Sequence, residues 1–115
     1  MIKMYFYLFA LMLLIIGCEL GPNCDYNKKL NKSIECLAVV VSKPVHSNVF
    51  LKNGYNPYTK KECNCEENDR WMRIYYDEMD IGDTIVKKKG DLFFQIHKTD
   101  TVITHFWKCD QKVYK

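Results

Sequence analysis

The C-terminal third of the chain contains short apolar segments separated by connections of only a few residues, and this spacing constrains the fold more than any other feature. Turn signals lie at Gly82-Asp83, around Gly90 and at 98–100. Parallel strands need a crossover of a dozen or more residues, whereas antiparallel strands are joined by short turns. We therefore predict an antiparallel meander whose strands begin or lie at 84–86, 92–97, 101–107 and 112–114.

The N-terminal half of the folded part is less regular. Residues 34–42 form a β-branched apolar run that ends before Pro44 and predicts a buried strand. Residues 53–57 are dense in turn residues and predict a loop. Residues 68–79 fit a helical spacing and a strand alternation alike; we favour a short helix capped by Asn68 or Asp69.

Together these segments predict a β-rich fold, mainly an antiparallel sheet or small barrel of four to six strands, with or without one short helix. Two aromatic pairs, Phe93-Phe94 and Phe106-Trp107, are consecutive in sequence. Because side chains alternate across a strand, one member of each pair must point away from the first face. Either other elements cover both faces, or an aromatic patch is exposed and marks a binding surface.

The first residues have the features of an export signal. One positive charge, Lys3, precedes thirteen apolar residues at 4–16. A helix of that length rises only about 20 Å, whereas a hydrocarbon core is about 30 Å thick. We therefore predict a signal peptide over 1–17 rather than a membrane-spanning helix.

The end of this apolar run, LIIGC at residues 14–18, resembles the lipobox of bacterial lipoproteins. The resemblance implies that the thiol of Cys18 receives a diacylglyceryl group and that cleavage occurs before it. Two or more acyl chains, palmitate among them, hold a protein stably on a membrane. The alternative is an ordinary secretory signal in which Cys18 is incidental.

Residues 18–33 are polar, rich in Asn and Lys, and contain Gly-Pro near their start, so we predict a polar tether followed by a single domain over 34–115. Without Lys3, the remaining chain has 16 Lys and Arg against 14 Asp and Glu. This balance gives no basic footprint for nucleic acid. The residues after Cys18 lack a run of acidic residues associated with surface display, which favours the periplasmic side of the bacterial cell envelope.

Five cysteines follow the predicted lipidation site. An exported chain meets an oxidising compartment, so we predict disulfides, and an odd number leaves at least one thiol unpaired or paired with another chain. We expect Cys109 to pair with Cys63 or Cys65, and Cys36 to pair with the other member of that pair or with Cys24. The sequence leaves the connectivity open among these disulfide candidates: Cys24, Cys36, Cys63, Cys65 and Cys109.

A zinc site built from Cys63, Cys65, Cys109 and a histidine is the sharper alternative. A Cys-x-Cys spacing is less typical of structural zinc than Cys-x-x-Cys, and the three histidines have no paired spacing. We therefore predict no metal site and no cofactor. No serine lies in a Gly-x-Ser-x-Gly turn, and His97 is expected opposite residue 102 rather than His105, so we predict no catalytic residues and no enzyme activity.

Residues 81–90 resemble a "hydrophobic-Gly-Asp-Ser/Thr-Ile-x-Lys-x-x-Gly" stretch that recurs in small uncharacterised lipoproteins of Bacteroidetes-type bacteria. The likeness covers about the last 35 residues and the signal, and it implies no activity and no functional residue. Charge at 87–89 is typical of a solvated hairpin turn, with contact to acidic lipid headgroups or an acidic protein as the alternative.

We therefore expect a non-catalytic envelope lipoprotein, anchored to the membrane through its lipid, that binds another protein or an envelope component. One version is an immunity-like protein that neutralises a toxin. The competing hypothesis is a metal- or small-ligand-binding envelope module.

Overall fold

The structure is a computed structural model that describes residues 3–5, 7, 23–67 and 69–115. The lipobox at 14–18, with Cys18, lies outside the described residues, as does most of the signal peptide predicted over 1–17. None of the helices in the described ranges has the length and apolar character required to cross a membrane.

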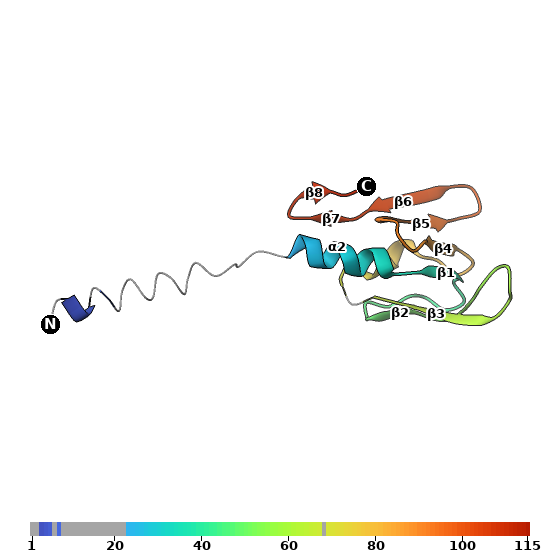
Figure 1. Cartoon of the computed structure of the whole chain (residues 1–115). Coiled ribbons are helices and arrows are strands. Elements are labelled where there is room, and N and C mark those ends of the chain that lie inside the picture. Colours follow the sequence, from blue (N-terminus) through green and yellow to red (C-terminus); the bar gives the residue numbers. More distant parts are fainter. Residues whose placement is uncertain (1–2, 6, 8–22, 68) are drawn as a thin grey trace.

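The described part of the chain forms a six-stranded antiparallel sheet, a small two-stranded sheet and short helices (Figure 1). This architecture confirms the prediction of a β-rich, mainly antiparallel fold. The large sheet has the strand order β3-β2-β1-β4-β5-β6. Its strands are β1 (Cys36–Val39), β2 (Val49–Tyr55), β3 (Glu62–Glu66), β4 (Thr84–Lys87), β5 (Phe93–His97) and β6 (Val102–Phe106), and the small sheet pairs β7 (Lys108–Cys109) with β8 (Lys112–Val113).

Strands β4, β5 and β6 form the predicted meander. β4 pairs with β5 and β5 with β6, both antiparallel, and His97 lies opposite Val102 as expected. Gly90, in the β4–β5 turn, has φ +95°, a conformation that glycine adopts without a steric cost. Local alternation and turn chemistry were thus sufficient to predict this part of the fold.

The β2–β3 hairpin differs from its predicted form. Residues 53–55, expected in a loop, extend strand β2, and the turn follows at 56–59, where the Asn56 side chain accepts hydrogen bonds from the backbone N–H groups of Tyr58 and Thr59. Position 54 of this strand is a glycine because the backbone of β1 passes too close to leave room for a side chain. A Cβ atom at Gly54 would lie 2.8 Å from the Val39 carbonyl oxygen.

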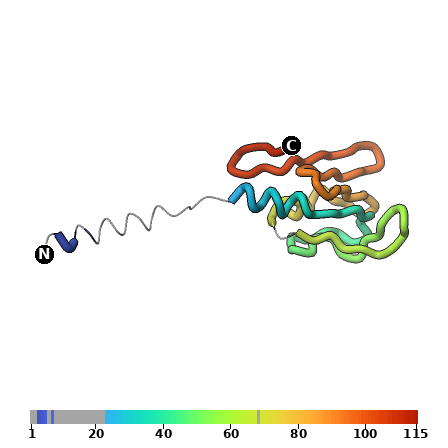
Figure 2. Tube along the Cα trace, viewed as in Figure 1, coloured from blue at the N-terminus to red at the C-terminus, as the bar shows by residue number. Residues whose placement is uncertain are grey.

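A ten-residue helix, α2 (Cys24–Ser33), occupies most of the segment predicted as a tether over 18–33, so that prediction is wrong for residues 24–33. Asn23 caps its first turn, with its side chain accepting a hydrogen bond from the Tyr26 N–H at 3.1 Å. The Cys24–Cys109 disulfide joins the start of the helix to β7, and Figure 2 shows the helix beside this C-terminal hairpin. The helix therefore belongs to the domain predicted to begin at residue 34.

One face of the six-stranded sheet forms the core. On this face, side chains of β1, β4 and β5 pack with Phe50 and Leu51 of β2 and with the loop and helix at 71–79. The Cys36–Cys65 disulfide fastens β3 to β1 within this core. We call this face the inner face. Its largest buried apolar residues are Ile85, Phe94 and Ile96 from the sheet, packed with Phe50, Leu51, Trp71, Met72, Met79 and Trp107.

The helix favoured for 68–79 is present as a short 3₁₀ helix, η1 (Arg73–Glu78). Asp69 does not cap its start, because Met72 is the residue at the cap position and makes no side-chain cap bond. Asn68, the other predicted cap, lies outside the described residues. The capping role belongs to Glu67, whose two carboxylate oxygens accept the N–H groups of Met72 and Arg73 at 2.8 and 2.7 Å.

The disulfide pairing was predicted in part. Cys36 pairs with Cys65, one of the alternatives, whereas the expected bond from Cys109 to Cys63 or Cys65 is wrong, since Cys109 pairs with Cys24. β3 is held against β1, whereas β7 lies beside the start of α2, so the expected partners are in different parts of the fold. Cys63 is the free cysteine of the described residues.

Candidate functional site

The second face of the sheet, the outer face, is the candidate functional site. Because side chains alternate along each strand, the residues between the buried positions of β1, β4 and β5 share this face, together with their cross-strand partners in β6. In β1, β4 and β5 these residues are half-buried, unlike their buried neighbours, and in β6 they are exposed and alternate with half-buried residues. The outer face consists of Leu37, Val39, Thr84, Val86, Phe93, Gln95, His97, Val102, Thr104 and Phe106.

A groove of about 520 Å³ lies on this face. Its floor comes from β1, β4 and β5, and the β2–β3 turn, with Pro57 and Tyr58, forms a wall. Tyr58 is 82% exposed, so its ring is available to an incoming molecule. Glu35, Lys88 and Lys89 also line the groove, so its floor of apolar and polar residues is bordered by charges of both signs.

The consecutive aromatic residues divide between the two faces. Phe94 and Trp107 are buried in the core, whereas Phe93 and Phe106 face outward and pack on each other with ring centroids 5.7 Å apart. Phe106 is 39% exposed and Val102 is 47% exposed. Of the two outcomes expected from the sequence, the exposed aromatic patch is the one observed.

Polar side chains on the outer face bond to one another. A ring nitrogen of His97 lies 2.9 Å from the Gln95 side-chain oxygen, and the Gln95 amide donates to the Thr104 hydroxyl at 3.3 Å. This row of side chains places hydrogen-bonding groups beside apolar residues. Binding surfaces for proteins and ligands have this mixture.

The three histidines lie in three different places. His97 is on the outer face, whereas His46 lies edge-on to Tyr76, with ring centroids 6.1 Å apart. His105 stacks on Tyr75 with ring centroids 3.6 Å apart, and its Nε2 lies 3.1 Å from a Glu78 carboxylate oxygen. The described histidines therefore do not converge on one reaction centre.

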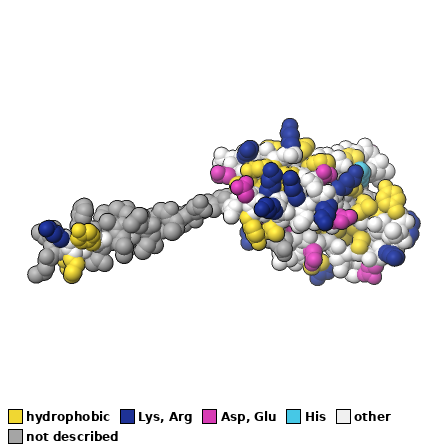
Figure 3. All heavy atoms as spheres, viewed as in Figure 1, with side chains coloured by type: hydrophobic (Ala, Val, Ile, Leu, Met, Phe, Trp, Pro, Cys, Tyr) yellow, Lys and Arg dark blue, Asp and Glu magenta, His cyan; other side chains and the backbone are white. Residues whose placement is uncertain are grey.

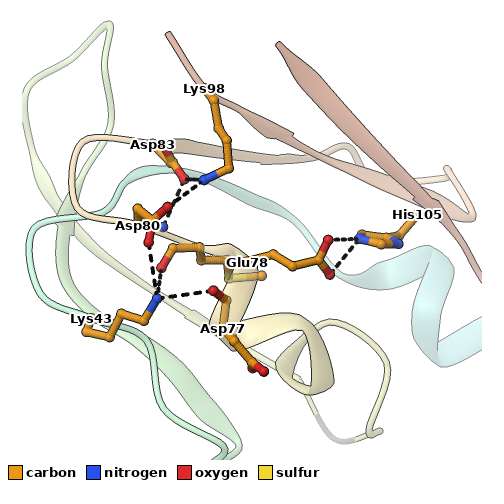
Figure 4. A network of polar contacts seen from close by, with 8 residues as sticks. Lys43, Asp77, Glu78, Asp80, Asp83, Lys98 and His105 are labelled. Atoms are coloured by element: carbon orange, nitrogen blue, oxygen red, sulfur yellow. Dashed lines mark hydrogen bonds and ion pairs between the residues drawn. The ribbon is translucent and has the colours of Figure 1, made fainter. Parts of the chain in front are cut away.

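A network of charges ties together the connections at one rim of the sheet (Figure 4). Asp80 binds Lys98 at 2.9 Å and Lys43 at 3.3 Å, and Lys98 also binds Asp83. Hydrogen bonds from Lys98 and Lys43 hold the pKa of Asp80 below its usual value, and bonds to Asp83 and Asp80 raise the pKa of Lys98. The network joins the loop after β1, the loop before β4 and the β5–β6 turn, and it holds these three connections together.

An acidic cleft of about 370 Å³ lies between the end of α2 and β3, with Glu66, Glu67 and Asp69 in its lining. Burial raises the pKa of Glu67 and outweighs the hydrogen bonds that lower it. Both Glu67 oxygens already hold the start of η1, so this carboxylate has a structural task.

Lys87 was assigned to a solvated turn, and the structure corrects this assignment. It ends β4 on the inner face, is 1% exposed, and its ammonium donates to the carbonyl oxygens of Ile34 and Lys88 at 2.9 and 2.7 Å. Burial lowers the pKa of Lys87. The alternation in residues 84–87 places Lys87 on the same side as Ile85, and this pattern is the sequence signal that indicates a buried lysine here.

The cysteines do not assemble the zinc set considered above. Cys65 and Cys109 belong to different disulfides, so their sulfurs are not available as thiolate ligands. Cys63 is half-buried, and burial together with the nearby Glu62 charge raises the pKa of its thiol. Within the ranges that the structure describes, no group of three or more His, Cys, Asp or Glu residues is arranged to hold a metal ion.

Comparisons with known proteins do not add an assignment. No protein-family model matches the chain, and no curated protein and no solved structure matches it either. The functional reasoning therefore rests on the residues and geometry described above.

Proposed function

We propose that this protein is a non-catalytic lipoprotein of the bacterial cell envelope, anchored to the membrane through Cys18, that binds another protein or an envelope component with its outer face. The observation that carries the binding role is the outer face itself. No described element packs over Phe106 and Val102 sufficiently to bury them. The groove lies on the same face, and its lining residue His97 is the cross-strand neighbour of Val102. Exposed apolar surface next to satisfied polar groups is typical of a recognition surface.

The anchoring role is supported by the sequence. Residues 1–17 have the pattern of a signal peptide, and LIIGC at 14–18 resembles a lipobox. Two disulfides in a small domain fit an oxidising compartment such as the periplasm. In the immunity-like version of this proposal, the partner is a toxin.

The lipid anchor is tested by the mass of the full-length protein extracted from bacterial membranes in mild detergent. We expect a mass that begins at Cys18 and carries a diacylglyceryl group. The Cys18→Ser variant is expected to leave the membrane fraction. An intact wild-type mass without lipid would overturn the anchored part of the proposal and leave the binding part standing.

The binding role is tested by site-specific photocross-linking in intact cells. A photoreactive residue in place of Val102 or Phe106 is expected to cross-link one defined partner, whereas the same residue in place of Lys61, on the exposed β2–β3 hairpin, is expected not to do so. The purified partner must then bind the wild type and lose at least about tenfold affinity, about 1.4 kcal/mol, for Phe106→Asp. Equal cross-linking from the outer face and from position 61 would argue against the outer face as the binding surface.

The groove also favours a second candidate, a small-ligand-binding envelope module. Its volume of about 520 Å³ lies within the roughly 300–1,000 Å³ typical of ligand sites. A native mass spectrum would then show a co-purifying small molecule that is lost in Thr84→Trp, where the indole fills the groove. A spectrum of the wild type free of any adduct would count against this candidate. The metal-binding version has lost the cysteine set on which it depended.

A further inference from the structure

We propose that a basic face, formed by α2, the β4–β5 turn and strand β8, rests on an anionic lipid surface and fixes the orientation of the domain on the membrane. The inference rests on the proposed lipid anchor, because the anchor brings this face close to the headgroups. The basic face comprises Lys28, Lys29 and Lys32 of α2, Lys88 and Lys89 of the β4–β5 turn, and Lys112 of β8.

Contacts between distant parts of the chain bring these lysines together. The Gly90 N–H donates to the Lys32 carbonyl oxygen at 2.7 Å, which holds the β4–β5 turn against the end of α2. The ammonium groups of Lys28 and Lys112 lie 5.6 and 5.1 Å from the centre of the Tyr114 ring, so this ring joins the helix to the C-terminal hairpin. Figure 3 shows Lys and Arg side chains gathered over α2.

The charge of this face is largely uncompensated within the described residues. Asp25, Glu35, Asp91 and Asp110 lie on or beside the same elements, and Glu35 lines the groove together with Lys88 and Lys89, but none of the six lysines forms an ion pair with a described carboxylate. All except Lys28 are exposed. Lys43 and Lys98, by contrast, are held by Asp80 and Asp83 at another rim of the sheet. The basic face therefore keeps its charge available for an external anionic partner.

The length of chain between the anchor and the helix supplies the second argument. Five residues lie between Cys18 and Cys24, so six residue-to-residue steps join them, and a fully extended chain spans at most about 3.6 Å per step. The start of α2 therefore stays within about 20 Å of the lipid headgroups when Cys18 is lipidated. Electrostatic attraction to a membrane falls off within a Debye length of about 8 Å, so the lysines interact when this face turns toward the bilayer.

The type of charge favours lipid over an acidic protein. Arginine recognises carboxylates with a fixed pair of donors, whereas lysine is a compact point charge on a flexible stem. The basic face contains lysines alone, spread over three elements, and both arginines, Arg70 and Arg73, lie at η1 instead. A spread of mobile ammonium groups matches a laterally mobile layer of anionic headgroups.

The test is a lysine-acetylation footprint of the full-length lipidated protein, read residue by residue by mass spectrometry. The protein is reconstituted in phosphatidylcholine vesicles with or without phosphatidylglycerol. We expect Lys29, Lys32, Lys88 and Lys89 to react several-fold more slowly on the anionic vesicles, and we expect this protection to vanish at high salt. Lys60, exposed on the β2–β3 hairpin, is the internal control and is expected to react equally on both.

Matched triple variants separate charge from structure. Lys29→Gln, Lys32→Gln and Lys88→Gln together are expected to abolish the difference in acetylation of Lys89 between the two vesicles. Lys52→Gln, Lys60→Gln and Lys61→Gln remove the same charge from the β2–β3 hairpin and are expected to preserve it. If the wild-type lysines are acetylated at equal rates on both kinds of vesicle while the protein stays bound, the proposed role of the basic face is wrong and the lipid anchor still stands. A wild type that is not retained on neutral vesicles overturns the lipid anchor instead.

Discussion

The inner and outer faces of the sheet use the same strands for different tasks. Phe94 is fully buried and packs against Trp71 with ring centroids 5.4 Å apart, whereas its neighbour Phe93 contacts Phe106 at the half-open outer face. Both residues are phenylalanines in β5, so residue type does not distinguish them. The difference arises because η1 and the β2–β3 hairpin cover one face and leave the other open.

The polar residues of the two faces differ in the same way. On the inner side, Lys87 and Glu67 are buried and each has two backbone partners. On the outer face, His97 and Gln95 bond to side chains and stay partly accessible. Buried polar groups require full hydrogen bonding, whereas accessible ones can exchange partners with water or a ligand.

The largest contrast is expected from matched phenylalanine substitutions. Phe94→Ala removes a buried ring from the inner face and is expected to lower the free energy of unfolding by about 3–5 kcal/mol. Phe93→Ala is expected to lower it by about 1 kcal/mol or less, because its ring is only half-buried. Urea unfolding followed by tryptophan fluorescence measures both. Similar losses for the two variants would refute the division into a core face and a recognition face.

The inner face also depends on its disulfide. Cys36→Ala with Cys65→Ala opens a crosslink between residues 29 positions apart and is expected to destabilise the protein by about 3.5 kcal/mol through loop-closure entropy. The control is Cys63→Ala, which removes the free thiol from the same strand and is expected to cost about 1 kcal/mol or less. Chemical denaturation under non-reducing conditions gives both values, and equal costs would show that the disulfide does not stabilise this face.

A smaller effect is expected where Glu67 holds the loop that covers the inner face. Glu67→Gln keeps one oxygen acceptor but replaces the other with a donor, so one of the two backbone N–H groups at the start of η1 loses its partner. We expect a loss of about 1–2 kcal/mol in thermal or urea unfolding. Glu66→Gln, at the exposed neighbouring position, is expected to change stability little, and the prediction fails if both variants behave alike.

The smallest effect is expected at the rim where the two faces meet. Lys98 and Lys43 lower the pKa of Asp80 in the folded protein, so the carboxylate stabilises the fold above its unfolded-state pKa, and this contribution is lost as the pH falls through the lowered value. Asp80→Asn should therefore be slightly less stable than the wild type at neutral pH, and the difference should disappear in acid. Melting temperatures of both proteins, measured from neutral pH to about pH 3, check this.

Asp77→Asn is the matched control for that titration. Asp77 is exposed, and its backbone carbonyl rather than its carboxylate accepts from Lys43. Its substitution is expected to leave the pH dependence of stability unchanged. A constant gap between the wild type and Asp80→Asn over the whole range would show that the charge of Asp80 does not contribute.

The helix α2 shows why part of the fold could not be predicted from the sequence. Its ten residues, CDYNKKLNKS, contain a single aliphatic side chain and no apolar stripe of the usual kind. The helix is held instead by the Cys24–Cys109 disulfide, by the buried Asn31 and by the Lys87 ammonium at the carbonyl of Ile34. All these contacts come from distant residues, so a local pattern indicated only polarity and was interpreted as a tether.

The sequence by itself determined the features that depend on neighbours along the chain. Alternation and short turns sufficed for the meander from β4 to β6 and for the register of His97 opposite Val102, and they required one aromatic residue of each pair to leave the core. An odd count of cysteines after Cys18 predicted at least one thiol that is unpaired or paired with another chain, and Cys63 is the free cysteine of the described residues.

Tertiary structure alone decided the rest. It determined that Cys109 pairs with Cys24, that Lys87 is buried, and that the face bearing Phe93 is the open one. Such choices depend on which segments distant in sequence pack together, because burial and disulfide formation require spatial proximity rather than a local pattern. For this reason the groove and the basic face became visible only once the chain was folded.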